Sequence, residues 1–387
     1  MKDARIAVVH DWLDTWGGGE SVLAEILRAY PQGELFALVD FFSDGLRARI
    51  GGRRARTTFL QRMPGARKHF RGYLPLFPRA IESLDLAAYD VILSTSHAVA
   101  KGVLTRPSQL HVCYCHTPMR YAWDLREQYL GQRGLATGVR GLVVNHLLDR
   151  LRDWDRASSA RVTEFVANSS YVRGRIARCY GRDATVIPPP VDTDFFTPAA
   201  PAPARDYYLA ASRWVPYKRG ELVAAAFRAL PEHRLVIAGD GPEGARIRAA
   251  MGGNAQWMGL VSRERMRDLL RGARAFVFAA EEDFGILPVE AQACGTPVIV
   301  YGRGGARETV RDGATGLFFD TQSAEAIADA VRRFEALVPG PDPADCRAQA
   351  LAFAAPRFTA DYTALVERAW GARKAAGDNR APWPAAS

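Results

Sequence analysis

The sequence predicts an α/β protein with two doubly wound parallel sheets, one in each half of the chain. Short apolar runs rich in Val and Ile alternate with segments of helical apolar spacing, which is typical of parallel α/β units. The alternation stops at a Pro- and Ala-rich stretch, residues 197–205, and then begins again. Two similar halves joined by a short linker indicate two Rossmann-like domains with parallel sheets facing across a cleft.

The first half opens with a strand, a glycine turn and a helix. The apolar run at 5–12 is followed closely by Gly17, Gly18 and Gly19, and helical spacing begins at residue 21. This order is that of the first unit of a parallel α/β fold. The further strands predicted in this half are 34–40, 89–96, 109–116, 164–169 and 184–190, and the clearest later helix is 171–181.

The second half repeats the pattern after the linker. Its predicted strands are 206–212, 234–240, 255–259, 273–280, 296–302 and 316–320. Its predicted helices are 221–230, 244–251, 263–273 and 323–337. We therefore expect a first domain over 1–197, a second over 205–355, and a helix over 356–372 that packs back on the first domain. Residues 373–387, rich in Ala, Pro, Gly and charge, are expected to form a disordered tail.

Composition excludes several classes of protein. The chain has 387 residues, of which 48% are hydrophobic and 24% charged, as in soluble globular proteins with sizeable cores. No apolar run reaches the roughly 18–20 residues of a transmembrane helix. The N-terminal sequence lacks the apolar segment and cleavage site of a signal peptide. We therefore expect a cytoplasmic protein.

The five cysteines do not form a disulfide pattern. They lie at positions 113, 115, 179, 294 and 346, too few and too scattered for such a framework. A zinc site at Cys113, Cys115 and His116 would need a further ligand cluster, and none is evident in the sequence. We expect buried, reduced thiols and no metal.

The net charge of +9 is concentrated in one segment. Between Gly45 and Ile81 there is no Asp or Glu, and the cations are Arg47, Arg49, Arg53, Arg54, Arg56, Arg62, Arg67, Lys68, Arg71 and Arg79. Aromatic and aliphatic residues lie among them, a mixture that suits an anionic membrane surface. The segment shows no RRM, KH or recognition-helix signature that would indicate a nucleic-acid-binding surface. The alternative interpretation of its charge is an arginine-rich surface that faces only solvent. We expect the basic segment 47–79 to bind the inner face of the cytoplasmic membrane.

A candidate phosphate site follows the predicted strand 273–280. The chain presents Glu282, turns at Gly285, and starts a helix near Ile286, with Pro288 tolerated in the first turn. Backbone N–H groups at such a helix start bind phosphate. Glu290 lies about a turn inside the helix, where it can accept hydrogen bonds from a ribose diol, and Glu282 can hold a second hydroxylated ring. The spacing predicts a sugar-nucleotide site.

Three segments resemble one enzyme family. The pattern E-D-F-G-I-x-P-x-E-A-x-A-C-G-T-P-V-I, which begins at Glu282, is similar to the E-x7-E signature of retaining glycosyltransferases of family 4, which have the GT-B fold. Residues 212–223 resemble the family's Arg-x4-Lys motif for the donor diphosphate. "CHTPMRYAWD" (115–124) resembles the segment in which the family keeps a histidine beside the reacting sugar. Other similar segments are "GGGE" (17–20), "GDGPE" (239–243), "GGARETV" (304–310) and "DGATGLFF" (312–319).

The resemblance implies a retaining, metal-independent transfer of a sugar from a nucleotide donor, without a cofactor. His116 and Glu282 would contact the transferred sugar and Glu290 the ribose, while cations and the helix start would stabilise the leaving diphosphate. The Asp-x-Asp at 192–194 lies in the approach to the linker and is not expected to bind metal. The donor-binding residues implied are Gly18, Gly19, Arg213, Lys218, Asp283, Phe284, Gly285, Ile286, Leu287 and Glu290.

Within that family, three segments are most similar to bacterial O-antigen and exopolysaccharide mannosyltransferases. They are "VHDW…TWGGGE", "CYCHTPMRYAWD" and "SRWVPYKR". This likeness implies GDP-mannose as donor and a lipid-linked saccharide as acceptor, with a UDP-sugar of glucose, galactose or N-acetylglucosamine as the alternative donor. An NAD-dependent dehydrogenase would need the missing G-x-G-x-x-G fingerprint. A non-enzymatic membrane scaffold would leave the phosphate site unexplained.

Overall fold

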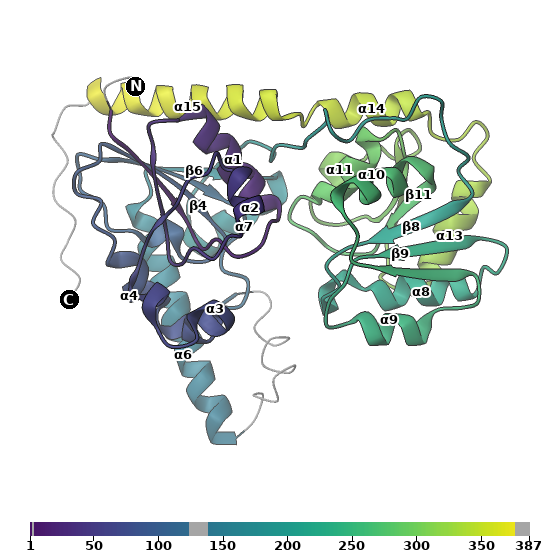
Figure 1. The fold of residues 1–387 in the computed structure, drawn as a ribbon, viewed down its shortest axis with the longest axis horizontal. Helices are drawn as coiled ribbons and strands as arrows, with labels where there is room; N and C mark the ends of the chain where they lie inside the picture. Colours follow the sequence, from purple (N-terminus) through teal and green to yellow (C-terminus); the bar gives the residue numbers. More distant parts are fainter. Residues whose placement is uncertain (2–3, 124–137, 376–387) are drawn as a thin grey trace. The chain divides into compact units, whose positions relative to one another are not determined.

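The computed structural model describes residues 1, 4–123 and 138–375, and all structural statements concern these residues. Contacts divide the chain into two compact units (Figure 1). The first unit comprises Met1–Pro188 with the C-terminal segment from Phe358, and the second comprises Pro189–Arg357. Each unit is built around one parallel sheet, so the expected fold class of two Rossmann-like domains is confirmed.

The first sheet has the strand order β3-β2-β1-β4-β5-β6-β7, with parallel pairing throughout. The strands are β1 (Ile6–His10), β2 (Glu34–Ala37), β3 (Arg56–Thr57), β4 (Val91–Ser96), β5 (Leu110–Cys115), β6 (Glu164–Ala167) and β7 (Thr185–Val186). All the strands predicted for this half are present. The two-residue β3 is an addition, too short to produce an alternating pattern in the sequence.

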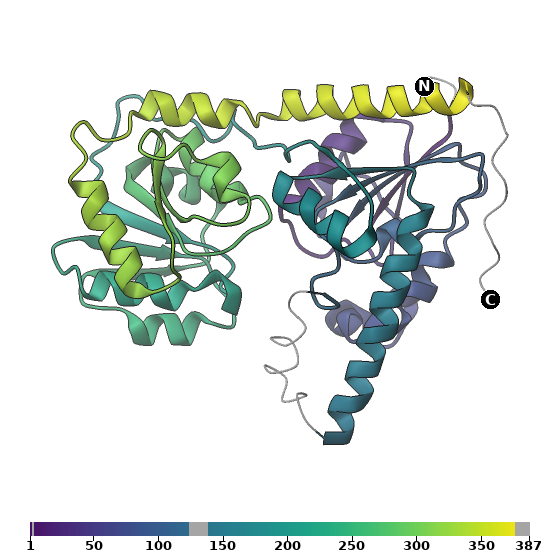
Figure 2. The same cartoon turned by 180° about the vertical axis from the view of Figure 1, so that it is seen from behind.

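Most helices of the first unit occur in the connections from one of these strands to the next, whereas α15 follows the second unit in the chain (Figures 1 and 2). They are α1 (Gly18–Ala29), α2 (Asp44–Ala48), α3 (Ala66–His69), α4 (Phe77–Glu82), α6 (Gly138–Ser158), α7 (Ser170–Tyr180) and α15 (Ala355–Ala375). Short 3-10 turns occur at η1 (Phe59–Arg62), η2 (Phe70–Leu76), η3 (Ala100–Gly102) and η4 (Ser159–Arg161). Among the helices of the described segments, none is long and apolar enough to cross a membrane.

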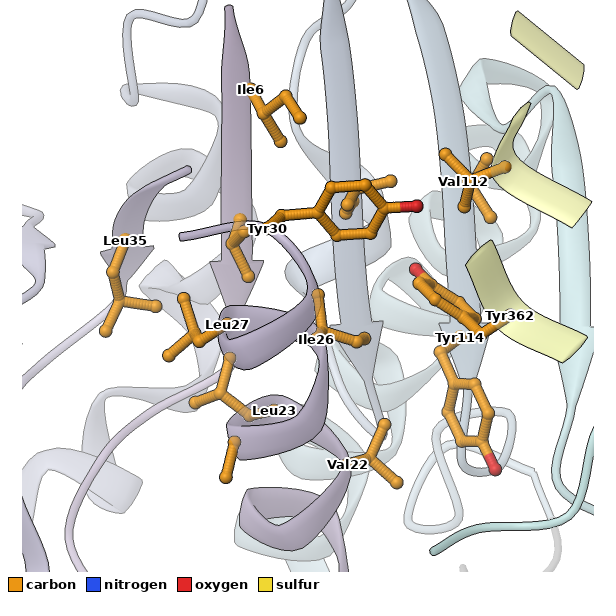
Figure 3. Packing of buried hydrophobic residues seen from close by; sticks show 14 of the residues in the cluster. Ile6, Val22, Leu23, Ile26, Leu27, Tyr30, Leu35, Val112, Tyr114 and Tyr362 are labelled. Carbon is orange, nitrogen blue, oxygen red and sulfur yellow. The ribbon is translucent and has the colours of Figure 1, made fainter. Parts of the chain in front are cut away.

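Both faces of the first sheet are covered by core residues. Along β1, Ile6 and Val8 belong to one buried cluster, and Ala7 and Val9 belong to another. Alternate residues of a strand point to opposite faces, so a fully apolar strand requires a core on each side. Figure 3 shows the first cluster, in which α1 packs against the sheet through Val22, Leu23, Ile26 and Leu27.

The C-terminal helix α15 belongs to the first unit. Phe358, Tyr362, Leu365 and Val366 are buried in the same cluster as β1 and α1. The ring centroid of Phe358 lies 5.7 Å from that of Tyr114 on β5, which fixes the helix against the sheet. Residues 373–375 form the last turn of α15, and the rest of the expected disordered tail, 376–387, lies outside the described residues.

The second sheet has the order β10-β9-β8-β11-β12-β13 and is also parallel. Its strands are β8 (Tyr207–Ala211), β9 (Arg234–Ala238), β10 (Ala255–Gly259), β11 (Ala273–Phe278), β12 (Val298–Tyr301) and β13 (Gly316–Phe319). Its helices are η5 (Pro216–Lys218), α8 (Gly220–Arg228), α9 (Gly244–Ala250), α10 (Arg263–Gly272), α11 (Ile286–Ala293), α12 (Ala306–Thr309), α13 (Ala324–Glu335) and α14 (Pro343–Leu351). Every strand and helix predicted for this half is present.

Contacts place the unit boundary earlier than the sequence-based domain boundary at residue 197. Val191 and Phe196 are buried in the core of the second unit, together with Leu209 of β8 and Leu270 of α10. These two apolar residues precede the linker in the sequence, so composition alone assigns them to the first half. The proline-rich residues 197–205 form no regular secondary structure.

Candidate functional site

The candidate donor site lies where the strand order of the second sheet reverses. The first strand of this unit, β8, pairs with both β9 and β11, and ligands of doubly wound sheets bind beyond the carboxyl ends at such a point. Arg213 and Lys218 follow β8, with Lys218 ending the turn η5. Glu282 follows β11, so the sheet brings together two motifs that are 64 residues apart in the sequence.

Lys218 and Glu282 form an ion pair between their Nζ and Oε1 atoms. Their side chains are only 14% and 18% exposed, so each charge is largely shielded from water and is compensated by the other. The Lys218 ammonium also lies 5.2 Å from the ring centroid of Phe278, the last residue of β11. The pair thus presents a fixed cation and a fixed carboxylate at one sheet edge.

Helix α11 begins directly beside this pair. Gly285 caps it in the left-handed conformation, with φ of 85°, which a side chain would disfavour. Ile286 and Leu287 supply the first backbone N–H groups of the helix, which are unpaired within it and can bind an anion. Glu290 lies one turn further along and is half-buried.

The structure divides the remaining predicted donor residues into two kinds. The side chain of Phe284 is buried in the core of the second unit, 5.4 Å between ring centroids from Phe353, so only its backbone can face a ligand. Asp283 is also buried, with 9% exposure. Arg213, in contrast, has an exposed side chain that can reach a phosphate. Sequence spacing alone could not distinguish these orientations.

In the first unit, the predicted His116 and Gly19 come together at the carboxyl end of the sheet. A Cβ atom on Gly19 would lie 3.5 Å from Nε2 of His116 and 3.7 Å from Cε1 of His10. Gly18 and Gly19 are the first residues of α1, with Gly17 as its N-cap, which corrects the expectation of a glycine loop before a helix starting at residue 21. Their backbone therefore forms a helix N-terminus.

His116 is fixed through its backbone and keeps one ring nitrogen available. Its N–H donates to the carbonyl of Ser96 at 2.9 Å, and its carbonyl accepts from Nδ2 of Asn168 at 2.9 Å. Its Nε2 is buried, and no described residue hydrogen-bonds to it. Burial, together with the nearby His97 and His10 rings, lowers the pKa of His116 well below its usual value, so the ring is neutral near pH 7.

A buried carboxylate that was not predicted from the sequence lies beside His97, whose ring centroid is 6.4 Å from that of His116. Asp11, which follows β1, is fully buried and accepts four backbone N–H bonds of 2.6–2.9 Å from residues 97–100. Its Oδ2 also lies 3.0 Å from Nδ1 of His97. The signal for this site was a His-Asp pair at the end of a buried strand, because that position places polar side chains at the carboxyl edge of the sheet.

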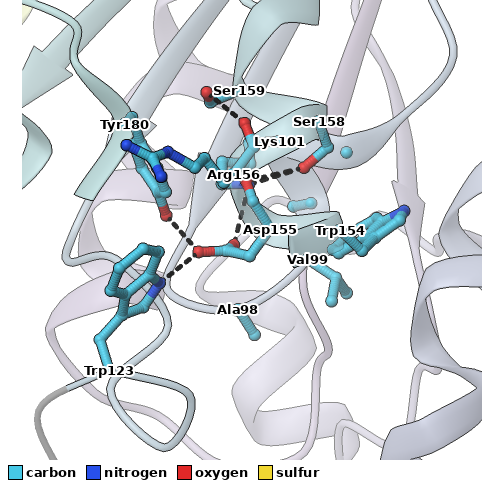
Figure 4. A network of polar contacts seen from close by, with 12 residues as sticks. Ala98, Val99, Lys101, Trp123, Trp154, Asp155, Arg156, Ser158, Ser159 and Tyr180 are labelled. Carbon is cyan, nitrogen blue, oxygen red and sulfur yellow. Dashed lines mark hydrogen bonds and ion pairs between the residues drawn. The ribbon is translucent and has the colours of Figure 1, made fainter. Parts of the chain in front are cut away.

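A second buried network holds the segment that follows His116 (Figure 4). Asp155 of α6 accepts hydrogen bonds from Trp123 Nε1 and from the Tyr180 hydroxyl, both at 2.9 Å. Lys101, 1% exposed, lies 2.9 Å from the other carboxylate oxygen. The network joins η3, α6 and α7 to Trp123, and so fixes the segment that begins at His116.

Comparisons with known proteins cover both units. Residues 16–195 match the family Glycosyltransferase Family 4, and residues 193–350 match the family Glycosyl transferases group 1. Together these matches cover residues 16–350, which include the whole second sheet, His116 and the candidate donor residues, but not β1 or Asp11. The chain belongs to the GT-B glycosyltransferases of family 4.

Curated members of this group are similar over part of their length. A GDP-mannose-dependent alpha-(1-6)-phosphatidylinositol monomannoside mannosyltransferase of Mycolicibacterium smegmatis is 34% identical over 203 residues, which is 45% of this chain and 53% of the relative. A D-inositol 3-phosphate glycosyltransferase of Mycobacteroides abscessus is 34% identical over 167 residues, 38% of each chain. The match therefore spans about half the length or less of these relatives.

Solved structures share the GT-B fold over nearly the whole chain. Anabaena HepE in complex with UDP and glucose superposes with a TM-score of 0.68 at 16% identity, covering 94% of this chain and 99% of the other. Sucrose-phosphate synthase from Thermosynechococcus elongatus gives a TM-score of 0.70 at 19% identity, covering 95% and 100%. At these identities the likeness establishes the fold.

Glycine residues of the second unit pack closely against the two loops that carry Arg213 and Glu282. A Cβ on Gly239 would lie 1.9 Å from the carbonyl oxygen of Ser212, and one on Gly241 would lie 2.3 Å from that of Trp214. The loop 239–243 thus packs directly on the loop that carries Arg213. Because backbone meets backbone here, no side chain can be accommodated.

Gly305 braces the loop that carries Glu282 in the same way. Its N–H donates to the Glu282 carbonyl at 2.9 Å, and an added Cβ would lie 2.5 Å from Cα of Phe284. Its φ is −66°, which alanine adopts freely, so a substitution tests only the close approach.

We expect Gly305→Ala to displace the Glu282 loop, because its Cβ has no space. Overpacking of this kind costs about 1–3 kcal/mol of folding free energy and should weaken nucleotide-sugar binding about tenfold. Urea denaturation and donor titration measure the two effects. Gly253→Ala is the control, since no atom lies within 4 Å of its added Cβ. Equal behaviour of the two variants would contradict the bracing role.

The basic segment 47–79 is only partly available to a partner. Arg47 is buried and pairs with Asp40 at 2.8 Å, and Arg71 pairs with Asp14 at 2.6 Å. Phe70 and Phe77 are core residues, which corrects the view that all the aromatic residues of the segment could face a surface. Exposed basic residues occur along the whole segment and include Arg49, Arg54, Arg56 and Arg79. The stretch 59–76 combines exposed Phe59 and Leu76, at 42% and 37%, with exposed Arg62, Arg67, Lys68 and His69.

Proposed function

We propose that this protein is a retaining hexosyltransferase that moves mannose from GDP-mannose onto a lipid-linked or growing saccharide acceptor in the synthesis of cell-surface polysaccharide. The observation that carries the proposal is the Lys218–Glu282 pair beside the start of α11. The ammonium and the helix N–H groups suit a diphosphate, the carboxylate suits sugar hydroxyls, and Glu290 suits a ribose.

Positive side chains and backbone N–H groups can stabilise the negative charge of the departing diphosphate. Cleavage of a nucleotide sugar places a growing negative charge on the diphosphate, and fixed donors lower the energy of that charge. Lys218, Arg213 and the N–H groups of Ile286 and Leu287 are such donors. The proposal therefore assigns no step to a metal ion or another cofactor.

The mannosyl donor is supported by the curated relatives. The Mycolicibacterium smegmatis relative is named for its dependence on GDP-mannose and is 34% identical over the matched region. A UDP-sugar is the alternative donor. Slow hydrolysis assayed across GDP-mannose, UDP-glucose, UDP-galactose and UDP-N-acetylglucosamine separates the two, since only the true donor should release nucleoside diphosphate at an enzyme-dependent rate. Release from a UDP-sugar alone would overturn the mannosyl assignment.

A lipid-linked acceptor requires the enzyme to work at a membrane. We propose that the exposed stretch 59–76 holds the protein on the anionic inner face of the cytoplasmic membrane. Its basic residues attract acidic headgroups, and exposed Phe59 and Leu76 can enter the interface. A non-enzymatic scaffold would share this surface but would not respond to nucleotide sugars.

We expect the purified protein to float with anionic vesicles, and Arg67→Gln with Lys68→Gln to weaken this binding about 30-fold. Each basic residue near the headgroups contributes about 1 kcal/mol, so two contribute about 2 kcal/mol. The matched control is Arg332→Gln with Arg333→Gln, an adjacent exposed pair on α13 of the second unit. Equal flotation of both double variants would exclude the stretch 59–76 as the membrane surface.

A further inference from the structure

Lys218 and Glu282 are each other's charge partner in the second unit. The ammonium of Lys218 contacts Oε1 of Glu282, and among the described residues no other acid pairs with Lys218. The ammonium also lies 5.2 Å from the ring centroids of Tyr217 and Phe278. Aromatic faces attract a cation but do not neutralise it. The Glu282 carboxylate therefore compensates the lysine charge, in a place where the two side chains are only 14% and 18% exposed.

The backbone on both sides of this pair is fixed. The Glu282 carbonyl accepts the N–H of Gly305 at 2.9 Å, and a Cβ on Gly304 would lie 2.2 Å from the same oxygen. The N–H of Lys218 donates to the Val215 carbonyl at 2.9 Å, which closes the turn η5. A change of partner must therefore come from the side chains, and the flexible four-carbon stem of lysine allows one.

A bound diphosphate would compete with Glu282 for Lys218. The start of α11 offers the backbone N–H groups of Ile286 and Leu287, and an anion held there also attracts the ammonium. A Cβ on Gly285, the cap of this helix, would lie 3.9 Å from Cβ of Glu282, so the carboxylate is close to the same anion and repels it. If Lys218 turns to the phosphates, Glu282 loses its cation, and a shielded, uncompensated charge is costly.

Sugar hydroxyls can remove this cost. A carboxylate accepts hydrogen bonds through both oxygens, so the hydroxyls of a sugar on the diphosphate can donate to Glu282 in place of Lys218. A nucleotide sugar thus satisfies both members of the pair, the ammonium through its phosphates and the carboxylate through its hydroxyls. A nucleoside diphosphate without the sugar satisfies only the ammonium.

We propose that Glu282 makes the site distinguish the donor from its product: the carboxylate gives up Lys218 while sugar hydroxyls occupy it, and takes Lys218 back once the sugar has been transferred. Recapture of the ammonium weakens the binding of the remaining nucleoside diphosphate and so favours its release. This inference rests on the proposed function, because it takes a nucleotide sugar as the ligand.

Loss of the negative charge at Glu282 should strengthen binding of the product. Without the carboxylate, Lys218 is available to the phosphates and a repulsion is removed, so a nucleoside diphosphate should bind more tightly. The nucleotide sugar gains the same ammonium but loses the charged acceptor of its hydroxyls, so its affinity should not rise. The preference of the site for donor over product should therefore fall.

Isothermal titration calorimetry of the full chain measures these affinities, with GDP and UDP as products and GDP-mannose and UDP-glucose as the corresponding donors. We expect Glu282→Gln to bind the nucleoside diphosphate about tenfold more tightly than the wild type, and the nucleotide sugar no more tightly. Lys218→Gln should bind the diphosphate more weakly, because it removes the cation for which the two groups compete. The control is Glu232→Gln, which removes the same charge from a side chain that is 59% exposed and should leave both affinities unchanged.

Equal or weaker binding of the diphosphate by Glu282→Gln, or the same gain in Glu232→Gln, would overturn the inference. An equal gain for the nucleotide sugar would also overturn it, because the carboxylate would then have no role toward the sugar. Glu282→Ala, which removes the same charge, takes the place of Glu282→Gln if the latter does not fold. A wild-type protein that binds none of the four ligands would refute the proposed function as well, whereas wild-type binding without the gain overturns this inference alone.

Discussion

Replacing Lys218 or Glu282 with alanine is expected to lower the rate of glycosyl transfer by about 100- to 1,000-fold. Loss of one preorganised charge at a developing leaving group has an effect of this size. Each substitution also leaves the charge of its partner uncompensated, although both side chains are less than one-fifth exposed. The measurement is kcat/KM for the donor identified by the hydrolysis panel, with circular dichroism as a check of folding.

The matched control for this prediction is Glu232→Ala. Glu232 is an exposed acid of the second unit that lies 3.5 Å from the adjacent His233, so its loss should leave the rate unchanged. Because Lys218 and Glu282 act as a unit, the double variant should be little slower than either single variant. Near wild-type turnover in either single variant would show that the Lys218–Glu282 pair is not needed for glycosyl transfer.

Replacing Asp11 with alanine is expected to lower the free energy of unfolding by about 3–5 kcal/mol. Four buried backbone N–H groups would lose their acceptor at once, and buried unsatisfied donors carry the full cost of desolvation. His97 would also lose its partner, so the wall of the His116 site would loosen. Urea denaturation, following the transition of the first unit, measures the loss.

Asp90→Ala is the comparison for that experiment. Asp90 also accepts a backbone N–H, from Arg5, but its side chain is 38% exposed, so water can replace it. We expect a change below about 1 kcal/mol there. A similar small change in Asp11→Ala would show that the loop 97–100 does not depend on the carboxylate.

The strands and the donor motif were predictable from sequence because both are local patterns. Buried parallel strands form short Val- and Ile-rich runs, and each predicted run contains a strand, whereas the two-residue β3 was not predicted. The Glu282–Glu290 spacing identifies a strand end, a turn and a helix start within one segment. The contact of Glu282 with Lys218 required in addition the adjacency of β8 and β11, which the doubly wound order supplies.

The histidine cluster was not predictable because its members share no local pattern. His10, His97 and His116 come from three strands that become neighbours only in the order β1-β4-β5. Helix α6 was missed for a different reason. Leu142 and Val143 are 72% and 55% exposed, so its apolar residues do not form the single stripe that identifies a surface helix.

We expect the Lys218–Glu282 site to bind a nucleotide sugar. Thermal unfolding of the protein with GDP-mannose, UDP-glucose or NAD tests it most directly, because a ligand that binds only the folded state raises Tm. We predict that a nucleotide sugar raises Tm, that NAD does not, and that Lys218→Ala abolishes the rise. No response to any nucleotide sugar, or an equal rise in Lys218→Ala, would contradict the account.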